Sequence, residues 1–217
     1  EKLPITLTSY SPCFRKEKGA HGIEERGIYR VHQFEKQEMI VVCKPEDSMD
    51  WYEKMWRYTV ELFRTLDIPV RQLECCSGDL ADLKVKSCYV EAWSPRQKKY
   101  FEVGSCSNLG DAQARRLGIR VKGADGKKYF AHTLNNTVVA SPRMLIAVLE
   151  NILNEDGSVN IPKALQPYMG GKEVIQVVTA DAFANTDFAA ATLTVIGKNC
   201  KDPVKAMKFI ELLNTDK

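Results

Sequence analysis

The chain has 217 residues, of which 44% are hydrophobic and 27% charged, and its formal net charge at pH 7 is +3. This composition is typical of a globular protein and excludes a largely disordered one. No run approaches the roughly 20 apolar residues that a membrane-spanning helix needs, so we expect no membrane partner. The mild basic excess permits contact with phosphates but is smaller than that of dedicated nucleic-acid-binding proteins.

The seven cysteines indicate neither a disulfide framework nor a zinc site. Their number is odd, no two are spaced as Cys-x-x-Cys, and the three histidines do not complete a metal-ligand pattern. We expect reduced thiols that pack mostly as small hydrophobic residues, as in cytoplasmic proteins. The chain opens at Glu1 with neither an initiator Met nor a signal-peptide pattern, so we interpret it as a fragment and not as a secreted protein.

In chain order, the first expected elements are two antiparallel strands, residues 5–15 and 34–43, joined by a long polar loop. In the second strand Glu38 shares a face with Ile40 and Val42, because side chains alternate along a strand. A carboxylate on an apolar face is costly unless a cation or a hydrogen-bond donor meets it. Glu38 is therefore either a paired structural charge or a ligand for an ammonium group.

A packing helix follows, capped by Asp47 or Ser48, with apolar residues at helical spacing up to Leu66. Two further strands are expected at residues 87–93 and 99–106. A short basic helix follows at residues 111–117, and then a hairpin that turns through Asp125-Gly126. We expect the strands and the hairpin to extend the antiparallel sheet.

Ser141-Pro142 is typical of the N-cap and first turn of a helix. Arg143 then lies in the first turn, where the helix dipole favours anions. We interpret it as a ligand for a bound anion, although for an isolated arginine a solvated or salt-bridged surface position would be the better interpretation. After Gly171 small residues dominate, and we expect a boundary that separates residues 1–174 from residues 175–217.

Four local clusters carry chemistry that fits one task. They are Arg15 with Glu17, Phe34 with Glu38, Glu102 with Ser105, and Asn135-Asn136-Thr137 with Arg143. Two arginines can neutralise a polyphosphate, an aromatic ring can stack on a base, and glutamate and serine oxygens can hold Mg²⁺ beside phosphates. Glu38 can bind an amine, and Thr137 can bind a hydroxyl group. Each cluster alone is common, but together they predict adenylation of a small hydroxylated amino acid.

These clusters lie in blocks that resemble the seryl-tRNA synthetases, a family of class II aminoacyl-tRNA synthetases. Phe14-Arg15-Lys16-Glu17 and residues 29–38 are similar to the family's motif 2, and residues 143–151 are similar to motif 3. Further blocks follow the family's order and spacing, at residues 44–48, 102–108, 111–116, 132–137, 155–159 and 162–170. The resemblance covers about residues 1–175.

The resemblance implies an α+β fold, namely a class II synthetase-like antiparallel β-sheet flanked by helices, truncated at its N-terminus and followed by a small α/β appendage. It implies a serine–tRNA ligase that activates L-serine with ATP and Mg²⁺ to seryl-adenylate and transfers the seryl group to tRNA(Ser), with tRNA(Sec) as a further substrate. A homodimeric parent protein and a cytoplasmic location are implied as well.

The family's functional residues carry over position by position. ATP would be bound by Arg15, Lys16, Glu17, Arg30, Phe34, Glu102, Val103, Gly104, Ser105 and Arg143. Arg15 at the α-phosphate and Arg143 at the γ-phosphate would also be catalytic, and Phe34 would stack on adenine. Glu102 and Ser105 would hold Mg²⁺. The serine substrate would be bound by Glu38, Asn135 and Thr137.

The chain departs from the family at several positions. Tyr89 stands where an acidic residue is expected, and Ala140 where class II enzymes often have glycine. The family's motif 1, its Thr-x-Glu serine-binding segment and its tRNA-binding arm precede the position of Glu1. These departures leave an alternative, a non-catalytic module that binds ATP or adenylate. Residues 181–217 resemble the C-terminal part of an extracellular solute-binding protein, which would make the chain a fusion of two unrelated gene fragments. This tail leaves a second alternative function, that of a solute-binding protein fragment.

Overall fold

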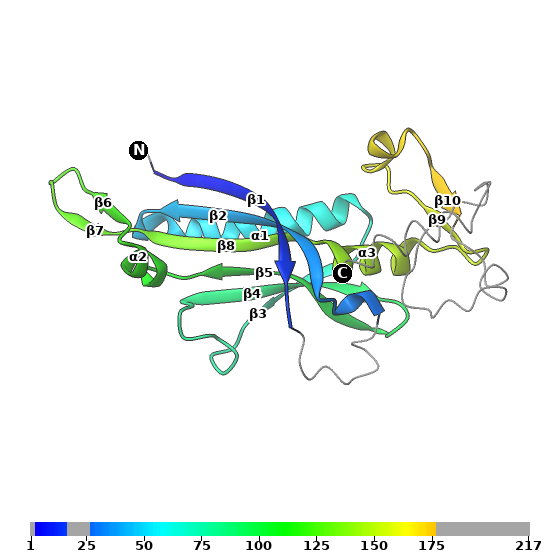
Figure 1. Cartoon of the computed structure of the whole chain (residues 1–217), viewed down its shortest axis with the longest axis horizontal. Coiled ribbons are helices and arrows are strands. Elements are labelled where there is room, and N and C mark those ends of the chain that lie inside the picture. The colour runs from blue at the N-terminus through cyan, green and yellow to red at the C-terminus, as the bar shows by residue number, and fades with distance from the viewer. Residues whose placement is uncertain (1–2, 17–26, 177–217) are drawn as a thin grey trace.

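The computed structural model describes residues 3–16 and 27–176, and its centre is an antiparallel sheet with the strand order β1-β2-β8-β5-β4-β3. The six strands span Ile5–Phe14 (β1), Gln33–Cys43 (β2), Val70–Glu74 (β3), Lys86–Ser94 (β4), Lys99–Asn108 (β5) and His132–Ala140 (β8). Strands β1 and β2 form the antiparallel pair predicted from the sequence, with Cys13 opposite Phe34. Figure 1 shows the sheet with helices beside it, which confirms the predicted fold class.

Helix α1, Ser48–Thr65, covers one face of the sheet (Figure 1). Its Tyr52 and Met55 are buried against Val41 and Cys43 of β2, in a cluster that reaches across β8 to β5 and β4. Each large side chain buried in this way contributes about 1.5–3 kcal/mol to stability. Because strand residues alternate, the neighbours of Val41 and Cys43 point to the opposite face, which α1 leaves uncovered.

Helix α3, Ser141–Ile152, continues directly from β8, and its Ala147 packs in a second core cluster with Phe63 and Val103. Both long helices begin without the side-chain caps predicted for them. The Ser48 hydroxyl donates to the Pro45 carbonyl (2.9 Å), because a 3₁₀ turn at Pro45–Asp47 (η3) leads into α1. Ser141 lies inside α3, since the N-cap position falls on Ala140 at the end of β8.

The smaller elements differ in part from expectation. The basic helix α2 is present at Ala112–Leu117, but the hairpin of β6 (Arg120–Lys122) and β7 (Lys128–Phe130) is a separate two-stranded sheet and does not extend the main one. The sequence indicated neither β3 nor the pair of β9 (Ser158–Asn160) and β10 (Val174–Gln176). The chain also forms 3₁₀ turns at Gly27–Tyr29 (η2) and Gln166–Met169 (η4).

The predicted boundary near residue 174 falls at the start of β10. The tail that resembles a solute-binding protein lies outside the described residues, so the division into two segments stays a prediction. Of the described helices, none is long and apolar enough to cross a membrane. Cys43, Cys88 and Cys106 are buried, as expected of thiols that pack as hydrophobic residues, and burial raises the pKa of the Cys43 thiol to about 11.

Asn136 joins β8 to α1. Its side-chain nitrogen donates to the Met55 carbonyl (2.9 Å) and to the Thr59 hydroxyl (2.8 Å), and the residue is fully buried. Its neighbours in β8, Asn135 and Thr137, therefore point to the uncovered face. The side-chain amide of Asn136 thus fixes the position of α1 on the sheet. It also determines which side chains of β8 point toward α1 and which point to the uncovered face.

We expect Asn136→Ala to lower the free energy of unfolding by about 1–3 kcal/mol, because it removes two buried hydrogen bonds. Urea denaturation followed by circular dichroism measures this change. The matched control is Asn135→Ala, one residue along the same strand but on the uncovered face, for which we expect less than about 0.5 kcal/mol. Equal losses in both variants would contradict the role given to Asn136.

Candidate functional site

The uncovered face of the sheet carries the polar residues that the sequence singled out. Thr137 of β8 lies opposite Glu38 of β2, and Asn135 lies opposite Ser107 of β5. Both pairs are on the face away from α1. The face is therefore lined by hydroxyl, amide and carboxylate groups in neighbouring strands.

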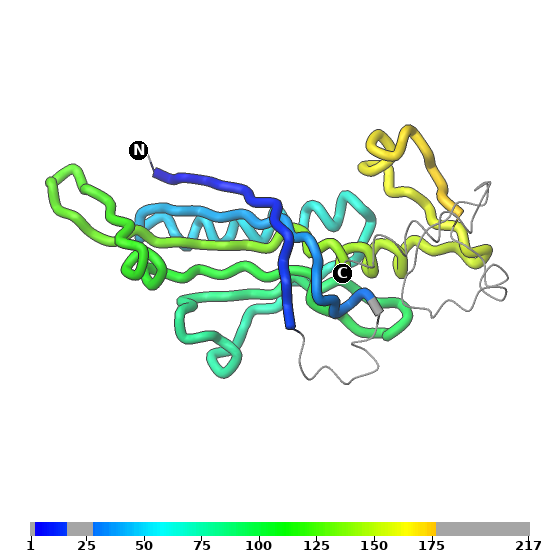
Figure 2. The backbone as a smooth tube through the Cα atoms, viewed as in Figure 1, coloured from blue at the N-terminus to red at the C-terminus, as the bar shows by residue number. Residues whose placement is uncertain are grey.

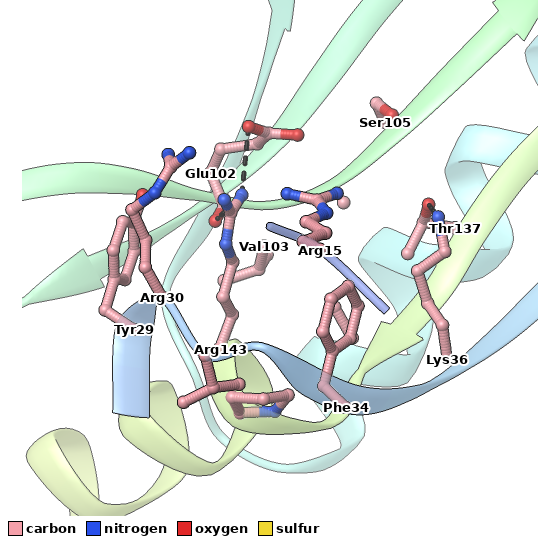
Figure 3. Close-up of a pocket in the computed structure, with 14 residues that line it drawn as sticks. Arg15, Tyr29, Arg30, Phe34, Lys36, Glu102, Val103, Ser105, Thr137 and Arg143 are labelled. Atoms are coloured by element: carbon pink, nitrogen blue, oxygen red, sulfur yellow. Dashed lines mark hydrogen bonds and ion pairs between the residues drawn. The ribbon is translucent and has the colours of Figure 1, made fainter. Parts of the chain in front are cut away.

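A cavity opens on this face where β1 and β2 approach η2 and the start of α3 (Figure 3). It is lined by Arg15, Tyr29, Arg30, Val31, Phe34, Lys36, Glu102, Val103, Gly104, Ser105, Thr137, Ala140, Pro142 and Arg143. Four of these residues are cationic and one is acidic, so the cavity is suited to a ligand that carries several negative charges.

Arg143 is held on two sides. Its Nη1 lies 3.0 Å from Glu102 Oε2 and donates to the Glu102 carbonyl oxygen at 3.2 Å (Figure 3). Its guanidinium also lies over the ring of Tyr29, 4.8 Å from the ring centroid. Tyr29 in turn makes an edge-on contact with Phe101 of β5, with 6.1 Å between ring centroids. The arginine in the first turn of α3 is thus aimed into the cavity by an ion pair and an aromatic ring.

Arg15 and Phe34 form the opposite wall. The Arg15 guanidinium carbon lies 5.1 Å from the centroid of the Phe34 ring. Phe34 lies in β2, where it pairs with Cys13, and Arg15 directly follows the last residue of the adjacent strand β1. A flat apolar ring beside a guanidinium can contact a planar base and an attached phosphate at the same time.

Glu38 is a paired charge. Its Oε1 accepts a hydrogen bond from the Thr137 hydroxyl (2.7 Å) and lies 2.5 Å from Lys36 Nζ. The side chain is 21% exposed, so the lysine meets a carboxylate that is largely removed from water. The first of the two interpretations of Glu38 is therefore confirmed, and its role as a ligand for an ammonium group stays a prediction.

The structure gathers most of the predicted site residues around this one cavity. They are Arg15, Arg30, Phe34, Glu102, Val103, Gly104, Ser105, Thr137 and Arg143. Lys16 is exposed and does not line the cavity, and Glu17 lies outside the described residues. Glu38 lies beside the cavity, bonded to Thr137, while Asn135 is two residues farther along β8 on the same face.

Sequence reasoning missed several lining residues, of which Tyr29 and Lys36 are the most informative. Lys36 could have been found from strand alternation, since it precedes Glu38 by two residues and so shares its face. Tyr29 lies in the block similar to motif 2, but no local pattern predicts its contact with Arg143, because that contact joins segments more than 100 residues apart.

Tyr89, found where an acidic residue was expected, lies opposite Ser105 across β4 and β5. Its hydroxyl donates to Asp79 Oδ2 at 2.9 Å, and this hydrogen bond raises the pKa of Tyr89. The loop after β3 thus supplies a carboxylate next to Tyr89, the position where an acidic residue was expected.

The residues present fit a magnesium ion that is shared with a phosphate ligand. Within residues 3–16 and 27–176, no group of three or more His, Cys, Asp or Glu side chains could hold a metal alone. Glu102 and Ser105, however, line the same cavity as the arginines. Mg²⁺ is typically bound by one or two protein oxygens together with substrate phosphates, and this donor set matches that pattern.

Comparisons with known proteins point to one family. The family of tRNA synthetase class II core domains (G, H, P, S and T) matches residues 1–152. The chain is 48% identical over 176 residues to a serine–tRNA ligase of Thermococcus sibiricus, which covers 81% of the chain and 39% of that protein. It is 46% identical over 177 residues to one from Neisseria meningitidis serogroup B, with 82% and 41% covered.

Solved structures agree with the sequence matches. A seryl-tRNA synthetase from Pyrococcus horikoshii complexed with ATP superposes with a TM-score of 0.77 at 47% identity, over 82% of this chain and 40% of that one. A cytoplasmic serine–tRNA ligase from Naegleria fowleri in complex with AMP gives a TM-score of 0.74 at 42% identity, over 80% and 41%. The chain thus spans about 40% of the length of these relatives.

Gly104 allows β5 and β8 to approach closely beside the cavity. A Cβ atom at this position would lie 2.8 Å from the Thr137 carbonyl oxygen, a backbone atom that cannot move without shifting the strand. The close approach therefore positions Thr137 relative to Ser105.

We expect Gly104→Ala to destabilise the chain by about 1–3 kcal/mol, because the added methyl group overpacks the β5–β8 contact. The matched control is Gly78→Ala, since a Cβ atom there meets nothing within 4 Å. Thermal unfolding of both variants beside the parent chain measures the difference. A Gly104→Ala variant as stable as Gly78→Ala would show that the two strands do not constrain each other here.

Proposed function

The chain belongs to the family of tRNA synthetase class II core domains, and from this premise we propose that its uncovered sheet face binds ATP and L-serine and forms seryl-adenylate, as the catalytic part of a serine–tRNA ligase. The carrying observation is the cavity in which Arg15, Arg143 and Phe34 converge beside Thr137. The similarity of the chain to serine–tRNA ligases supports serine as the amino acid.

In the proposed reaction, a carboxylate oxygen of serine attacks the α-phosphorus of ATP. The new O–P bond forms while the bond from the α-phosphorus to the bridging oxygen breaks, and pyrophosphate leaves with that electron pair. No proton is transferred, so no side-chain base or nucleophile is needed. Catalysis would come from positioning and from neutralising negative charge on the phosphates.

The chain's own residues divide this work. Phe34 would stack on adenine, and Arg15 beside it would contact the α-phosphate, consistent with the 5.1 Å contact between them. Arg30 and Arg143 would bind the outer phosphates, and their bidentate forks suit phosphate oxygens.

Glu102 and Ser105 would hold Mg²⁺ together with the phosphates, and the ion would supply further neutralisation of their charge. Glu102 is paired with Arg143 at 3.0 Å. Binding of ATP would therefore exchange partners, with Arg143 turning to a phosphate and the carboxylate of Glu102 becoming available. This exchange keeps each charge neutralised before and after binding.

Serine would be recognised beside Thr137. Its ammonium group would bind Glu38, which Lys36 neutralises in the present arrangement, and its hydroxyl would bind Thr137. Asn135 would contribute an amide from the next position of β8 on this face. A site that hydrogen-bonds a substrate hydroxyl rejects analogues that lack it, because its own polar groups would be left unpaired.

In the second step, a hydroxyl at the 3′ end of tRNA(Ser) would attack the seryl carbonyl carbon. The new ester C–O bond would form while the bond from that carbon to the AMP phosphate oxygen breaks, and AMP would leave with that electron pair while its phosphate accepts the hydroxyl proton. We include tRNA(Sec) as a second acceptor, a homodimeric parent protein and a cytoplasmic location in the proposal. The alternative function is a module that binds ATP or adenylate without catalysis. It differs from this proposal only in that no seryl-adenylate is formed, and measurements of pyrophosphate exchange and of ligand binding distinguish the two.

We expect serine-dependent ATP–pyrophosphate exchange by the chain, and a loss of about 100-fold or more in Arg15→Ala, in line with removal of one charge-stabilising donor. Arg64→Ala, an exposed position on α1, is the control and should exchange at the parent rate. Equal exchange rates in Arg15→Ala and the parent would contradict the proposal. Calorimetry that detects binding of an adenylate analogue without exchange would favour the non-catalytic alternative.

Tyr29 is expected to position Arg143 for ATP. Replacing the ring in Tyr29→Leu should weaken ATP binding about two- to thirtyfold, the range given by a cation–π contact of about 0.5–2 kcal/mol. Tyr29→Phe keeps the ring under the guanidinium and should bind ATP like the parent. Isothermal calorimetry with ATP and Mg²⁺ separates the two variants. Equal affinities of Tyr29→Leu and Tyr29→Phe for ATP would show that the aromatic ring does not position Arg143.

A further inference from the structure

A strongly basic projection stands at one end of the sheet, away from the cavity. The β6–β7 hairpin extends there beyond the ends of the main strands, and helix α2 lies beside its base (Figures 1 and 2). Residues 111–130 contain six Lys or Arg and two Asp, a net charge of +4, whereas the whole chain carries +3. The projection therefore carries a net positive charge of its own, to which no residue that lines the cavity contributes.

The six basic side chains, which we call the basic hairpin surface, are Arg115, Arg116, Arg120, Lys122, Lys127 and Lys128. All six are exposed. Arg115 pairs with Asp111 at 2.7 Å, and Lys127 lies 3.8 Å from Asp125 at the tip, where both side chains are well exposed to screening solvent. Among the described residues, no ion pair joins Arg116, Lys122 or Lys128 to a carboxylate.

The pairing of the hairpin puts like charges face to face. Lys122 lies directly opposite Lys128, and Arg120 lies opposite Phe130 on the same face. Like charges in opposite positions of an antiparallel pair are destabilising. A bound anion between them removes this repulsion, so the hairpin gains more from an anionic partner than separate surface lysines would.

Two arginines of this surface are held in place by one aromatic ring. The guanidinium carbons of Arg115 and Arg120 lie 4.7 Å and 5.1 Å from the centroid of the Phe130 ring. Stacking restricts both side chains before any ligand arrives, which lowers the entropy lost on binding. Planar guanidinium groups in fixed positions suit phosphate oxygens.

The shape of the surface favours a nucleic-acid backbone over a lipid bilayer. The turn at residues 123–126 contains Gly, Ala, Asp and Gly, with no aromatic or large apolar side chain to insert among acyl chains. Same-face positions along the strands repeat at about 6.6 Å. The cations therefore form a short row, which suits the repeated single charges of a phosphodiester chain.

We propose that the basic hairpin surface binds the sugar–phosphate backbone of an RNA, at a place separate from the cavity. The choice of tRNA as that RNA rests on the proposed function, whereas the contact with a phosphodiester backbone rests on the hairpin alone. Binding is independent of ATP and serine, and it carries no base specificity of its own.

The test compares two charge-matched double variants of the full chain for binding of a tRNA(Ser) transcript by fluorescence anisotropy. Lys122→Gln with Lys128→Gln removes the facing pair on the hairpin. Arg57→Gln with Arg64→Gln removes the same charge from the exposed side of α1. We expect the hairpin variant to lose about tenfold or more in affinity at 0.1 M salt and the control to bind like the parent. The slope of log K against log salt should fall by about 1.5–2 in the hairpin variant alone.

Equal affinities for the hairpin variant and the parent, or an equal loss in the α1 control, would overturn the proposal. Binding to phosphatidylserine vesicles as strong as to tRNA, and lost in the same variant, would replace RNA by a lipid surface and would overturn it as well. Thermal unfolding checks that the hairpin variant is folded, and removal of the repulsion should leave its stability at or above that of the parent.

The outcome is separable from that of the proposed function. The hairpin variant should keep the parent's serine-dependent pyrophosphate exchange, because the hairpin does not line the cavity. A chain without exchange whose tRNA binding still depends on Lys122 and Lys128 would contradict the proposed function and support the hairpin contact. A chain that catalyses exchange but whose tRNA binding does not depend on Lys122 and Lys128 would support the proposed function and contradict the hairpin contact.

Discussion

The buried amide of Asn136 decides which face of the sheet stays open, and the site depends on that choice. Its two hydrogen bonds to α1 hold the helix under β8 and direct Asn136 toward the core. A slip of one residue in the pairing of β8 would exchange the two faces and turn Thr137 toward α1. The same constraint reaches β5, where Gly104 lets the strand approach the Thr137 backbone. Packing on the covered face thus positions polar groups on the other.

The charges on the open face are arranged so that both carboxylates of the site within the described residues already have a cation. Glu102 faces Arg143, and Glu38 faces Lys36. Pairs of this kind avoid the cost of a desolvated, unpaired charge while the site is without ligand. In the proposed function, phosphates and an ammonium group replace one member of each pair. Substrate binding is then an exchange of partners, and the cations of the basic hairpin surface, at the far end of the sheet, remain for a larger anion.

Much of this arrangement could be predicted from the sequence, for identifiable reasons. Strands β1 and β2 and helix α1 carry clear periodic patterns, and Arg15, Phe34, Glu102 and Arg143 are of types that fit a nucleotide. Asp47 occupies the N-cap position of α1 as predicted, although its side chain makes no capping hydrogen bond. The cap predicted for α3 was wrong, because Ser141 lies inside the helix and its hydroxyl donates to the Glu35 carbonyl of β2. The edge strand β3 is short and mostly polar, so it lacks a pattern. Contacts such as Tyr29 with Arg143 arise only from tertiary packing, and no local pattern encodes them.

A crystal structure of the chain with ATP, Mg²⁺ and L-serine tests most directly whether the open face is the catalytic site. The expected result is adenine on Phe34, the α-phosphate at Arg15, the serine ammonium at Glu38, and the ion pair between Glu102 and Arg143 opened. A nucleotide bound elsewhere, with the Glu102–Arg143 and Glu38–Lys36 pairs intact, would contradict it.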